Sequence, residues 1–361
     1  MNVLQVCAYA AEYEGNFIKS LRCLDNLLRE QGHNTLYAFP ENAKNKEWCA
    51  ELSKTSKVFF LPLAKARIKP ETYRKLKKIM SDNNIDIVHS HFELYDIPCN
   101  IMRPKNTKVF WHLHDPIKKS KQKSRNILNT LQYKWFGKDC TLVSVSDHYK
   151  DVVIDMGFNR NRTVTVLNGI DLGRISYPYD QKEKNYDFVT FGWDFKRKGS
   201  DIIFNALSKL YASGYKFKLL FNCNESTITE LNHFWGSDKY PEWLEVGMPV
   251  ENINTIFSKT DTFVQASRRE TFSYAVCEAA YAGLNVIASD IYGLEWANEV
   301  PTVTFFENED VDGLCNLLKN ALDSKSVPEE KQINDARNII ESKFSTLVWA
   351  KNIMDIYYSY L

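Results

Sequence analysis

Two glutamates, Glu270 and Glu278, are the residues whose type and spacing say most about chemistry in this chain. The segment between them has the composition of a helix, which we predict over 272–282. One carboxylate would precede that helix and the other would lie inside it, about 12 Å further along its axis. This separation suits a nucleotide sugar that extends from its hexose to its ribose. Isolated surface glutamates are more often simply solvated, so the interpretation depends on what surrounds the pair.

The start of the predicted helix is a second candidate binding feature. Ser267 or Thr271 has a side chain suited to the N-cap, and Gly283 follows the helix as a stop signal. We expect the free N–H groups of Thr271, Phe272 and Ser273 to face a phosphate, because unpaired amides at a helix start attract anions.

A basic turn in the second half of the chain offers matching cations. Lys196, Arg197 and Lys198 come just before a helix that we expect to begin near Ser200 or Asp201. Cationic side chains and helix N–H groups would therefore converge on one place, where a diphosphate is the natural partner. A solvated basic turn is the alternative.

Four histidines lie at the ends of two predicted strands in the first half, and they are His89, His91, His112 and His114. Residues two apart in a strand share a face, so each pair could point one way. Hydrogen bonding to an organic substrate and metal binding compete as interpretations, but only Asp115 and Glu93 could complete a metal shell nearby. We expect no metal, and we assign a functional role to His114, which Asp115 and Pro116 follow where the strand must end.

Residues 103–138 carry a strong local charge bias, with ten Lys or Arg residues and one acid, Asp115. Apolar residues are interleaved in its later part, namely Ile127, Leu128, Leu131, Tyr133, Trp135 and Phe136. Such a segment can dock on an anionic membrane or a lipid-linked phosphate, although a solvated face explains it too. No aromatic stacking platform favours nucleic acid.

Composition limits the class of protein. A chain of 361 residues is long enough for two domains, and a net charge of +1 predicts no polyanionic partner. Eight scattered cysteines without a C-x-x-C pair indicate reduced thiols. The chain begins without a basic n-region or a long apolar stretch, so we expect a cytoplasmic protein that acts at most at the inner face of a membrane.

Short apolar runs alternate with helical patterns along most of the chain, which is typical of α/β proteins with parallel sheets. In the first half we expect strands at 3–7, 35–38, 58–61, 85–89, 109–112, 142–145 and 163–167. In the second half we expect them at 188–191, 218–222, 244–246, 262–265, 286–288 and 302–305. The predicted domains are 1–170 and 171–344, and the boundary between them falls in a linker region over 168–187. A final helix over 345–361 should pack back on the first domain and across both.

Taken together, these segments resemble the retaining glycosyltransferases of family four. The motifs that carry the resemblance are DIVHSHF (86–92), WHLHDP (111–116), VSVSDHYKD (143–151), TVLNGIDL (165–172), FGWDFKRKGSD (191–201) and ETFSYAVCEAAYAGLNVIASD (270–290). The last is the most specific, because acid spacing, helix, glycine and strand all match. The resemblance implies the GT-B fold, in which two Rossmann-like domains with parallel sheets face a central cleft.

The resemblance also implies roles for single residues on the donor side. Glu270 is similar to the glutamate that addresses the donor hexose near its anomeric centre, and Glu278 to the one that binds the ribose. Lys198 resembles the lysine that holds the diphosphate. The backbone of Thr271, Phe272 and Ser273 matches the stretch that meets sugar and phosphate.

In the first domain, His114 resembles the histidine that faces sugar and acceptor. Gly15 falls in the family's glycine loop, but Asn16 stands where a second glycine is usual. Met248 lies where the base pocket would be expected.

One departure from the family pattern concerns Trp193, which occupies the position of a usual arginine. Losing one preorganised donor to the diphosphate would weaken leaving-group stabilisation by about 2–4 kcal/mol. We expect Arg197 to replace that cation, with Lys196 as the second candidate.

The resemblance therefore implies transfer of a hexosyl unit, with retention, from a nucleoside diphosphate sugar to a hydroxyl. We favour a UDP-sugar over a GDP-sugar, and a glycan or lipid-linked acceptor in surface polysaccharide or glycoconjugate synthesis. Lys198, Arg197 and helix dipoles would meet the diphosphate charge, so we expect neither a metal nor another cofactor. Two alternatives stay open: a catalytically silent GT-B partner subunit, and a metal hydrolase built on the four histidines.

Overall fold

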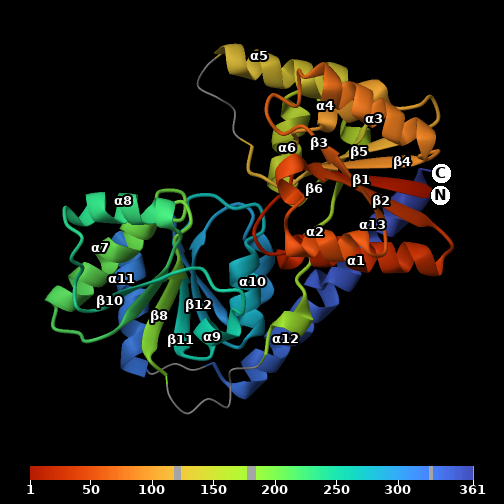
Figure 1. Ribbon diagram of the computed structural model, residues 1–361. Helices are drawn as coiled ribbons and strands as arrows, with labels where there is room; N and C mark the ends of the chain where they lie inside the picture. Colours follow the sequence, from red (N-terminus) through yellow and green to blue (C-terminus); the bar gives the residue numbers. More distant parts are fainter. Residues whose placement is uncertain (118–122, 177–183, 325–327, 361) are drawn as a thin grey trace. The chain divides into compact units, whose positions relative to one another are not determined.

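The computed structural model describes residues 1–117, 123–176, 184–324 and 328–360. The chain divides into two compact units, which we call unit 1 and unit 2 (Figure 1). Unit 1 contains Met1–Gly169 and Thr346–Leu361, and unit 2 contains Ile170–Ser345. The final helix therefore belongs with unit 1. In the described ranges, no helix combines the length and the apolar character needed to cross a membrane.

Unit 1 is built on a sheet of seven parallel strands in the order β3-β2-β1-β4-β5-β6-β7. The strands are β1 (Asn2–Cys7), β2 (Asn34–Pro40), β3 (Lys57–Leu61), β4 (Ile87–His91), β5 (Lys108–Leu113), β6 (Thr141–Ser144) and β7 (Thr163–Thr165). The prediction for the fourth strand was two residues too early, because Ile85 and Asp86 precede it and His91 is its last residue. Ser90 and His91 are fully buried, which keeps them in the ladder.

Helices cover both faces of this sheet, as the continuous apolar strands require. The helices of unit 1 are α1 (Gly15–Glu30), α2 (Glu47–Ser53), α3 (Pro70–Asp82), α4 (Asp96–Met102), α5 (Lys123–Leu131), α6 (Asp147–Asp155) and α13 (Thr346–Ser359), with short 3-10 turns at Glu41–Ala43 and Arg160–Arg162. One apolar core lies between the sheet and α1, α2 and α13. A second core lies between the opposite face and α3, α4 and α6 (Figure 1).

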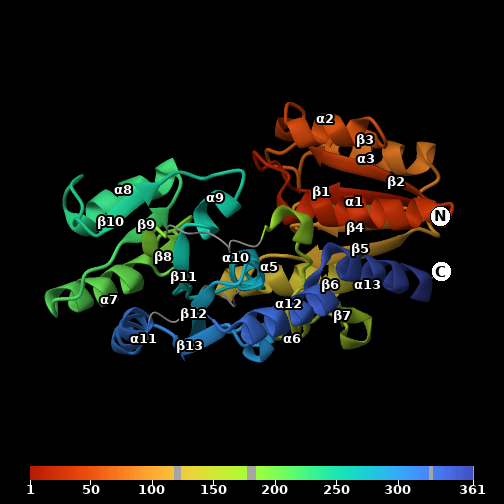
Figure 2. The same ribbon diagram turned by 90° about the horizontal axis from the view of Figure 1, so that it is seen from below.

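Unit 2 has a sheet of six parallel strands in the order β10-β9-β8-β11-β12-β13. They are β8 (Tyr186–Phe191), β9 (Leu219–Asn222), β10 (Leu244–Gly247), β11 (Thr260–Gln265), β12 (Asn285–Asp290) and β13 (Val303–Glu307). The helices are α7 (Ser200–Ala212), α8 (Glu225–Trp235), α9 (Asn254–Phe257), α10 (Tyr274–Tyr281), α11 (Val311–Ser324) and α12 (Glu330–Phe344), with 3-10 turns at Leu172–Arg174 and Glu295–Glu299. Figure 2 shows α7 and α11 side by side, and α10 packs against α12.

Each sheet has one point at which the strand order reverses. In unit 1 it lies between β1 and β4, and in unit 2 between β8 and β11. In open parallel sheets, ligands bind beyond the carboxyl ends of the strands at such a switch point. The loops that follow these four strands are therefore where functional side chains are expected to gather, and the predicted α/β class with two Rossmann-like sheets is confirmed.

Candidate active site

The switch point of unit 2 brings Lys198 and Glu270 together. The loop after β8 carries Lys198 and the loop after β11 carries Glu270. The Nζ atom of Lys198 lies 2.7 Å from Oε1 of Glu270, and Nη1 of Arg197 lies 3.4 Å from the same oxygen. The hydroxyl of Ser267 also donates to that oxygen at 2.8 Å. A buried carboxylate thus holds two cations in place beside a strand end, where an anionic ligand would arrive.

The loop of Lys198 is shaped by a close backbone approach. Gly199 has φ +67°, and a Cβ atom there would lie 1.9 Å from the carbonyl oxygen of Ala266. Only glycine therefore lets this loop pass so near the end of β11. The Nε atom of Arg197 pairs with Oδ2 of Asp194 at 2.9 Å, and the amide of Lys198 donates to the carbonyl of Asp194 at 2.9 Å. The two cations are positioned by the turn itself.

The loop of Glu270 is fixed from the other side. Ser289 at the end of β12 donates its hydroxyl to the carbonyl of Ser267 at 2.6 Å. Gly293 has φ +90°, and a Cβ atom there would lie 2.3 Å from the carbonyl oxygen of Glu270. The amide of Arg268 donates to the carbonyl of Arg197 at 2.8 Å, which joins this loop to the lysine loop. Gly199, Gly293 and Arg268 were not predicted as site residues, although Gly199 lies within the FGWDFKRKGSD motif and Gly293 lies three residues after the last motif.

Lys196 takes no part in this cluster. Its Nζ lies 2.9 Å from Oδ2 of Asp201, and the guanidinium of Arg268 lies 2.9 and 3.0 Å from the two oxygens of the same carboxylate. Burial alone would raise the pKa of Asp201, but the hydrogen bonds from Arg268 and Lys196 lower it below its usual value. Of the two cations proposed to compensate for Trp193, the structure brings only Arg197 to Glu270.

The start of α10 differs from the prediction. The helix begins at Tyr274, and Ser273 is its N-cap, with a hydroxyl that accepts from the amide of Val276 at 3.5 Å. The prediction that Ser267 or Thr271 caps this helix is therefore wrong, since Ser267 instead donates to Glu270. Ser273 has φ +61°, a strained value for serine, and its hydroxyl also donates to Oε1 of Gln265 at 2.9 Å.

The later start of α10 also changes which amides lie in its first turn. Thr271, Phe272 and Ser273 precede the helix, so the amides of its first turn begin with Tyr274. The Phe272 ring is buried against Trp296 at 5.0 Å between ring centroids, and Nε1 of Trp296 donates to the Phe272 carbonyl at 2.7 Å. The side chain of Phe272 is therefore a core residue, and only the backbone of this stretch remains a candidate contact for the donor.

Glu278 lies within α10, as predicted. It is 6% exposed, and its Oε1 atom lies 3.2 Å from Nη1 of Arg174, at the end of a 3-10 turn. Arg174 was not predicted as a site residue, although it follows the TVLNGIDL motif by two residues. Met248 lies directly after β10 with 46% of its surface exposed, and its carbonyl accepts from the side-chain amide of Asn222 at 2.5 Å.

Unit 1 carries His114 just beyond β5, at the same strand ends as the switch point between β1 and β4. Nε2 of His114 lies 3.0 Å from Nδ1 of His91, whose Nε2 lies 2.9 Å from Oε1 of Gln5. Because that Gln5 oxygen accepts, His91 donates to it and must accept from His114. Burial lowers the pKa of His114 to about 3, so this imidazole is neutral at pH 7 and acts as a hydrogen-bonding group.

The rings of the other three histidines, His89, His91 and His112, lie close together in unit 1. Their buried nitrogens include Nε2 of His89 and both nitrogens of His112, which have no hydrogen-bond partner among the described residues. One ring nitrogen from each of His89, His91 and His112 lies within 4.8 Å of the other two. However, the rings of His89 and His112 are 9° from parallel with centroids 5.1 Å apart. A metal lies in the plane of each imidazole that binds it. The expectation that no metal binds at these histidines stays a prediction.

Gly15 opens α1 directly after the loop that follows β1. It has φ +55°, and a Cβ atom there would lie 3.4 Å from the hydroxyl of Tyr9. Asn16 is buried, and its carbonyl accepts from the hydroxyl of Ser20 at 2.9 Å. Asn16 thus takes part in the first turn of the helix.

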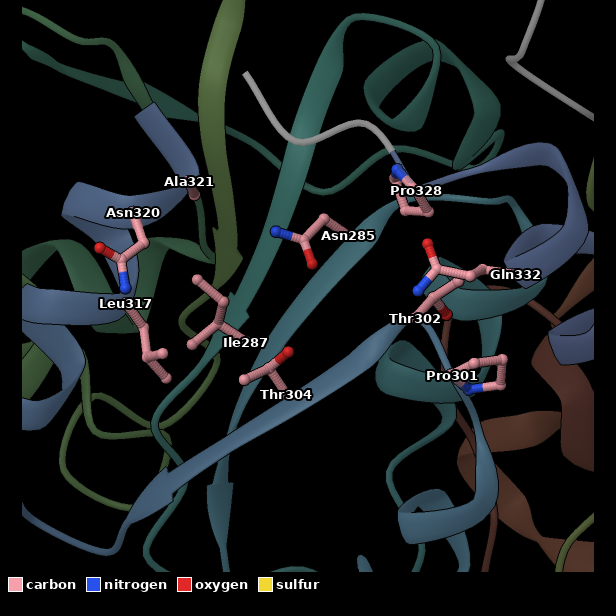
Figure 3. Close-up of a pocket in the computed structure, with 10 residues that line it drawn as sticks. All are labelled: Asn285, Ile287, Pro301, Thr302, Thr304, Leu317, Asn320, Ala321, Pro328 and Gln332. Atoms are coloured by element: carbon pink, nitrogen blue, oxygen red, sulfur yellow. The ribbon is translucent and has the colours of Figure 1, made fainter. Parts of the chain in front are cut away.

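A hollow elsewhere in unit 2 is shown in Figure 3, and it is distinct from this cluster. Asn285, the first residue of β12, and Thr302, just before β13, line it together with residues of α11 and α12. These are the amino ends of the strands, whereas Lys198 and Glu270 lie beyond carboxyl ends. The described residues that line the hollow include no charged side chain, and the hollow is not assigned a role in the chemistry.

Comparisons with known proteins bear on the identity of this site. A model of Glycosyltransferase Family 4 matches residues 21–174, and one of Glycosyl transferases group 1 matches residues 175–339. The chain belongs to glycosyltransferase family 4. The predicted family is therefore confirmed, and the two matched regions contain the motifs of this glycosyltransferase that carry His114, Lys198, Glu270 and Glu278.

Solved structures show the same fold for this glycosyltransferase. A glycosyltransferase from Rickettsia africae is 17% identical, with a TM-score of 0.79 over 99% of this chain and 98% of that one. A sucrose-phosphate synthase from Thermosynechococcus elongatus is 14% identical, with a TM-score of 0.79 over 99% of each chain. The Anabaena protein HepE, solved with UDP and glucose, is 14% identical, with a TM-score of 0.76 over 99% of this chain and 100% of that one. No curated protein matches the sequence.

Proposed function

We propose that this glycosyltransferase moves a hexosyl unit from a nucleoside diphosphate sugar to a hydroxyl, with retention of the anomeric configuration. The observation that carries the proposal is the contact between Lys198 and Glu270, with Arg197 beside them, at the switch point of unit 2. Two cations on a rigid turn are suited to a diphosphate, and a buried carboxylate next to them is suited to a sugar hydroxyl.

In the proposed reaction, the bond between the anomeric carbon and the diphosphate oxygen breaks while the acceptor oxygen bonds to the same face. The acceptor proton passes to the departing phosphate oxygen, so the balance needs no protein base. Lys198 and Arg197 stabilise the negative charge that develops on the leaving group. Glu270 holds both cations and positions the hexose, and it forms no covalent bond with it.

Three further residues have positioning roles in this proposal. Glu278 would accept hydrogen bonds from the ribose hydroxyls, in place of its present contact with Arg174. His114 would offer a neutral imidazole to a sugar or acceptor hydroxyl, consistent with its depressed pKa. Met248, exposed after β10, would contact the base. The backbone of 271–273 would approach the sugar and phosphates, and the loop at Gly15 and Asn16 stays a candidate for donor binding.

We favour a UDP-sugar as donor, because HepE, which shares the fold, was solved with UDP and glucose. The charge of the diphosphate would be met by side chains and helix dipoles, without a metal or another cofactor. For the acceptor we propose a glycan or a lipid-linked hydroxyl in surface polysaccharide or glycoconjugate synthesis. Such an acceptor would place the enzyme at the cytoplasmic face of a membrane.

The experiment is to incubate the purified chain with each common UDP-hexose and a simple glycan or lipid-linked acceptor, in chelator. The configuration of the new glycosidic bond is then determined by proton NMR. A product with the donor's anomeric configuration, formed at the same rate with and without chelator, is the expected result. An inverted product would contradict retention, and loss of activity in chelator would contradict metal independence.

A catalytically silent partner subunit is the second candidate, and Trp193 is the observation that favours it, since this half-exposed side chain stands where the family usually has a cation. The position of Arg197 beside Glu270 argues for the active enzyme instead. Calorimetric titration with UDP and GDP separates the two candidates. An intact fold that binds neither nucleotide would favour the silent subunit.

A further inference from the structure

A cluster of exposed apolar side chains lies on one outer surface of unit 1. It is formed by α5 and by the π-helical segment η2 (Gln132–Phe136) that continues it (Figure 1). Ile127 is 61% exposed, Leu128 65% and Trp135 70%. We call this the α5 surface, and its described apolar residues are Ile127, Leu128, Leu131, Trp135 and Phe136. Contiguous apolar exposure of this kind marks an interaction site.

The opposite side of the same segment is anchored in the protein, which holds the apolar side outward. Tyr133 is buried and donates its hydroxyl to Oε1 of Glu93 at 3.1 Å. Gln132 is buried and accepts from Nη1 of Arg67 at 3.4 Å. The prediction that grouped Tyr133 with the apolar face is therefore corrected, because this side chain points into unit 1. The remaining apolar side chains stay in solvent although their neighbours have found partners.

Cations surround the α5 surface. Lys134 and Lys138 are exposed within and just after η2. Arg103 follows α4, which is joined to η2 because the side-chain amide of Asn100 donates to the carbonyl of Phe136. In the sequence, residues 103–138 hold ten Lys or Arg residues and one acid. Lys118, Lys119 and Lys121 belong to this set but lie outside the described residues, and the side chain of Lys123 is likewise not described.

A basic hollow adjoins this surface at the amino ends of β4, β5 and β6. Arg103, Lys105, Lys108 and Arg162 line it, together with Asp86 and Asp139. Asp139 is engaged by Arg103 at 3.2 Å, and its carbonyl accepts from Arg162 at 3.0 Å. The acids therefore neutralise only part of the positive charge. A hollow with surplus cations next to exposed tryptophan and leucine is complementary to anionic headgroups above an acyl layer.

We infer that the α5 surface docks on an anionic membrane. Trp135, Leu128 and Ile127 enter the boundary between headgroups and acyl chains, while Lys134, Lys138 and the basic hollow contact the headgroups. Charge complementarity selects this occupant over a second copy of the chain, because two such basic surfaces would repel each other. The inference does not depend on the proposed sugar transfer, since membrane binding needs no donor.

The test is co-flotation of the full chain with vesicles of phosphatidylglycerol or of phosphatidylcholine. We expect binding to phosphatidylglycerol that weakens with salt, and little binding to phosphatidylcholine. Leu128→Glu and Trp135→Glu should each lower the partition coefficient about tenfold or more. The double variant Lys134→Glu/Lys138→Glu should lower it by about tenfold as well.

Leu347→Glu is the matched control, because Leu347 is also exposed in unit 1 but lies in α13. This variant should leave the partition coefficient within about twofold of that of the unaltered chain, because the electrostatic effect of one exposed charge is small. Equal binding to both vesicles, absence of binding, or an equal loss in Leu347→Glu would overturn the inference. The inference would also be overturned if the chain self-associated, floated with neither vesicle, and became monomeric in the Trp135→Glu variant. Binding of UDP by each variant shows separately whether the fold and the proposed donor site are intact.

Discussion

The ammonium of Lys198 lies 2.7 Å from the carboxylate of Glu270, and both side chains are largely buried. The two residues come from loops that follow adjacent parallel strands, β8 and β11, where the strand order of unit 2 reverses. Both loops are held by close backbone contacts, because Gly199 packs the lysine loop against Ala266 and Gly293, which follows β12, packs against the carbonyl of Glu270. The pair is thus preorganised, which is what stabilisation of a leaving group requires.

Replacing Lys198 should remove most of the activity. Lys198→Met keeps the length of the side chain but leaves the diphosphate with Arg197 alone, so we expect kcat/KM to fall by roughly 100- to 1000-fold. Steady-state kinetics of nucleotide release measure the change. Lys196→Met is the matched control, since Lys196 contacts Asp201 instead, and its effect should stay within about threefold. Equal losses in the two variants would contradict the assignment of Lys198.

Arg197 should supply the cation that Trp193 lacks. Arg197→Gln removes a charged donor near Glu270, and we expect the Kd for UDP to rise by about 10- to 100-fold. Adding Trp193→Arg to that variant should restore part of the affinity, because the cation returns at a neighbouring position. Calorimetric titration measures both. An unaltered Kd in Arg197→Gln would show that Arg197 does not compensate.

Glu278 should contribute to nucleoside binding and not to phosphate binding. Glu278→Gln weakens hydrogen bonds to ribose hydroxyls, so we expect the Kd for UDP to rise about tenfold while that for pyrophosphate does not rise. Lys198→Met, by contrast, should weaken the binding of both ligands. Glu341→Gln serves as control, because Glu341 accepts from Tyr281 of the same helix α10. A parallel loss of pyrophosphate binding in Glu278→Gln would place this residue elsewhere.

The glycine at 199 should be indispensable for stability. Gly199→Ala adds a Cβ atom 1.9 Å from the carbonyl oxygen of Ala266 at a positive φ, and we expect roughly 2–5 kcal/mol of lost unfolding free energy. Gly236→Ala is the control, because Gly236 has nearly the same φ with nothing within 4 Å of the added atom. Strain alone should cost it about 1–2 kcal/mol. Urea denaturation compares the two, and equal costs would show that the loops do not touch so closely.

The imidazole stack should make unit 1 sensitive to acid. Burial lowers the pKa of His89 and of His114 to about 3, against 6.5 for the ordinary group. Above pH 6.5 both states bind the same protons, and stability is full. As pH falls from 6.5 toward 3 the unfolded chain binds protons that the folded chain does not, so stability decreases by about 1.4 kcal/mol per pH unit for each histidine.

Urea denaturation at pH 7 and pH 5 measures this dependence. His89→Asn should reduce the slope with pH, whereas His233→Asn should not, because His233 is exposed on α8. A slope that His89→Asn leaves unchanged would mean that the stack does not set the acid sensitivity.

The sequence allowed the strands to be predicted because parallel strands buried on both faces are continuous apolar runs. Glu270, Lys198 and Glu278 could be predicted as candidate site residues for the same reason, since they follow such runs at recognisable distances in the sequence. The cap of α10 could not be predicted, because nothing in the sequence indicates that Ser273 adopts φ +61° while the Ser267 hydroxyl donates to Glu270. Side-chain hydroxyls serve as caps or as tertiary donors according to backbone geometry alone.

The sequence also did not indicate which of the three consecutive cations contacts Glu270. Lys196, Arg197 and Lys198 look equivalent in sequence, and the turn stabilised by Asp194 sends only the last two toward the carboxylate. Tyr133 shows the opposite case. It is two residues from Leu131, which places it near the far side of a helix, so its burial was available from helical spacing.

A donor screen by nucleotide release, performed with the unaltered chain and with Lys198→Met, tests the proposed sugar transfer. The chain is incubated with a panel of UDP- and GDP-sugars, and the free nucleoside diphosphate is quantified. We expect release from at least one donor, and a decrease of roughly 100-fold or more in Lys198→Met. Release from none of them, with no binding of UDP or GDP in calorimetry, would contradict it.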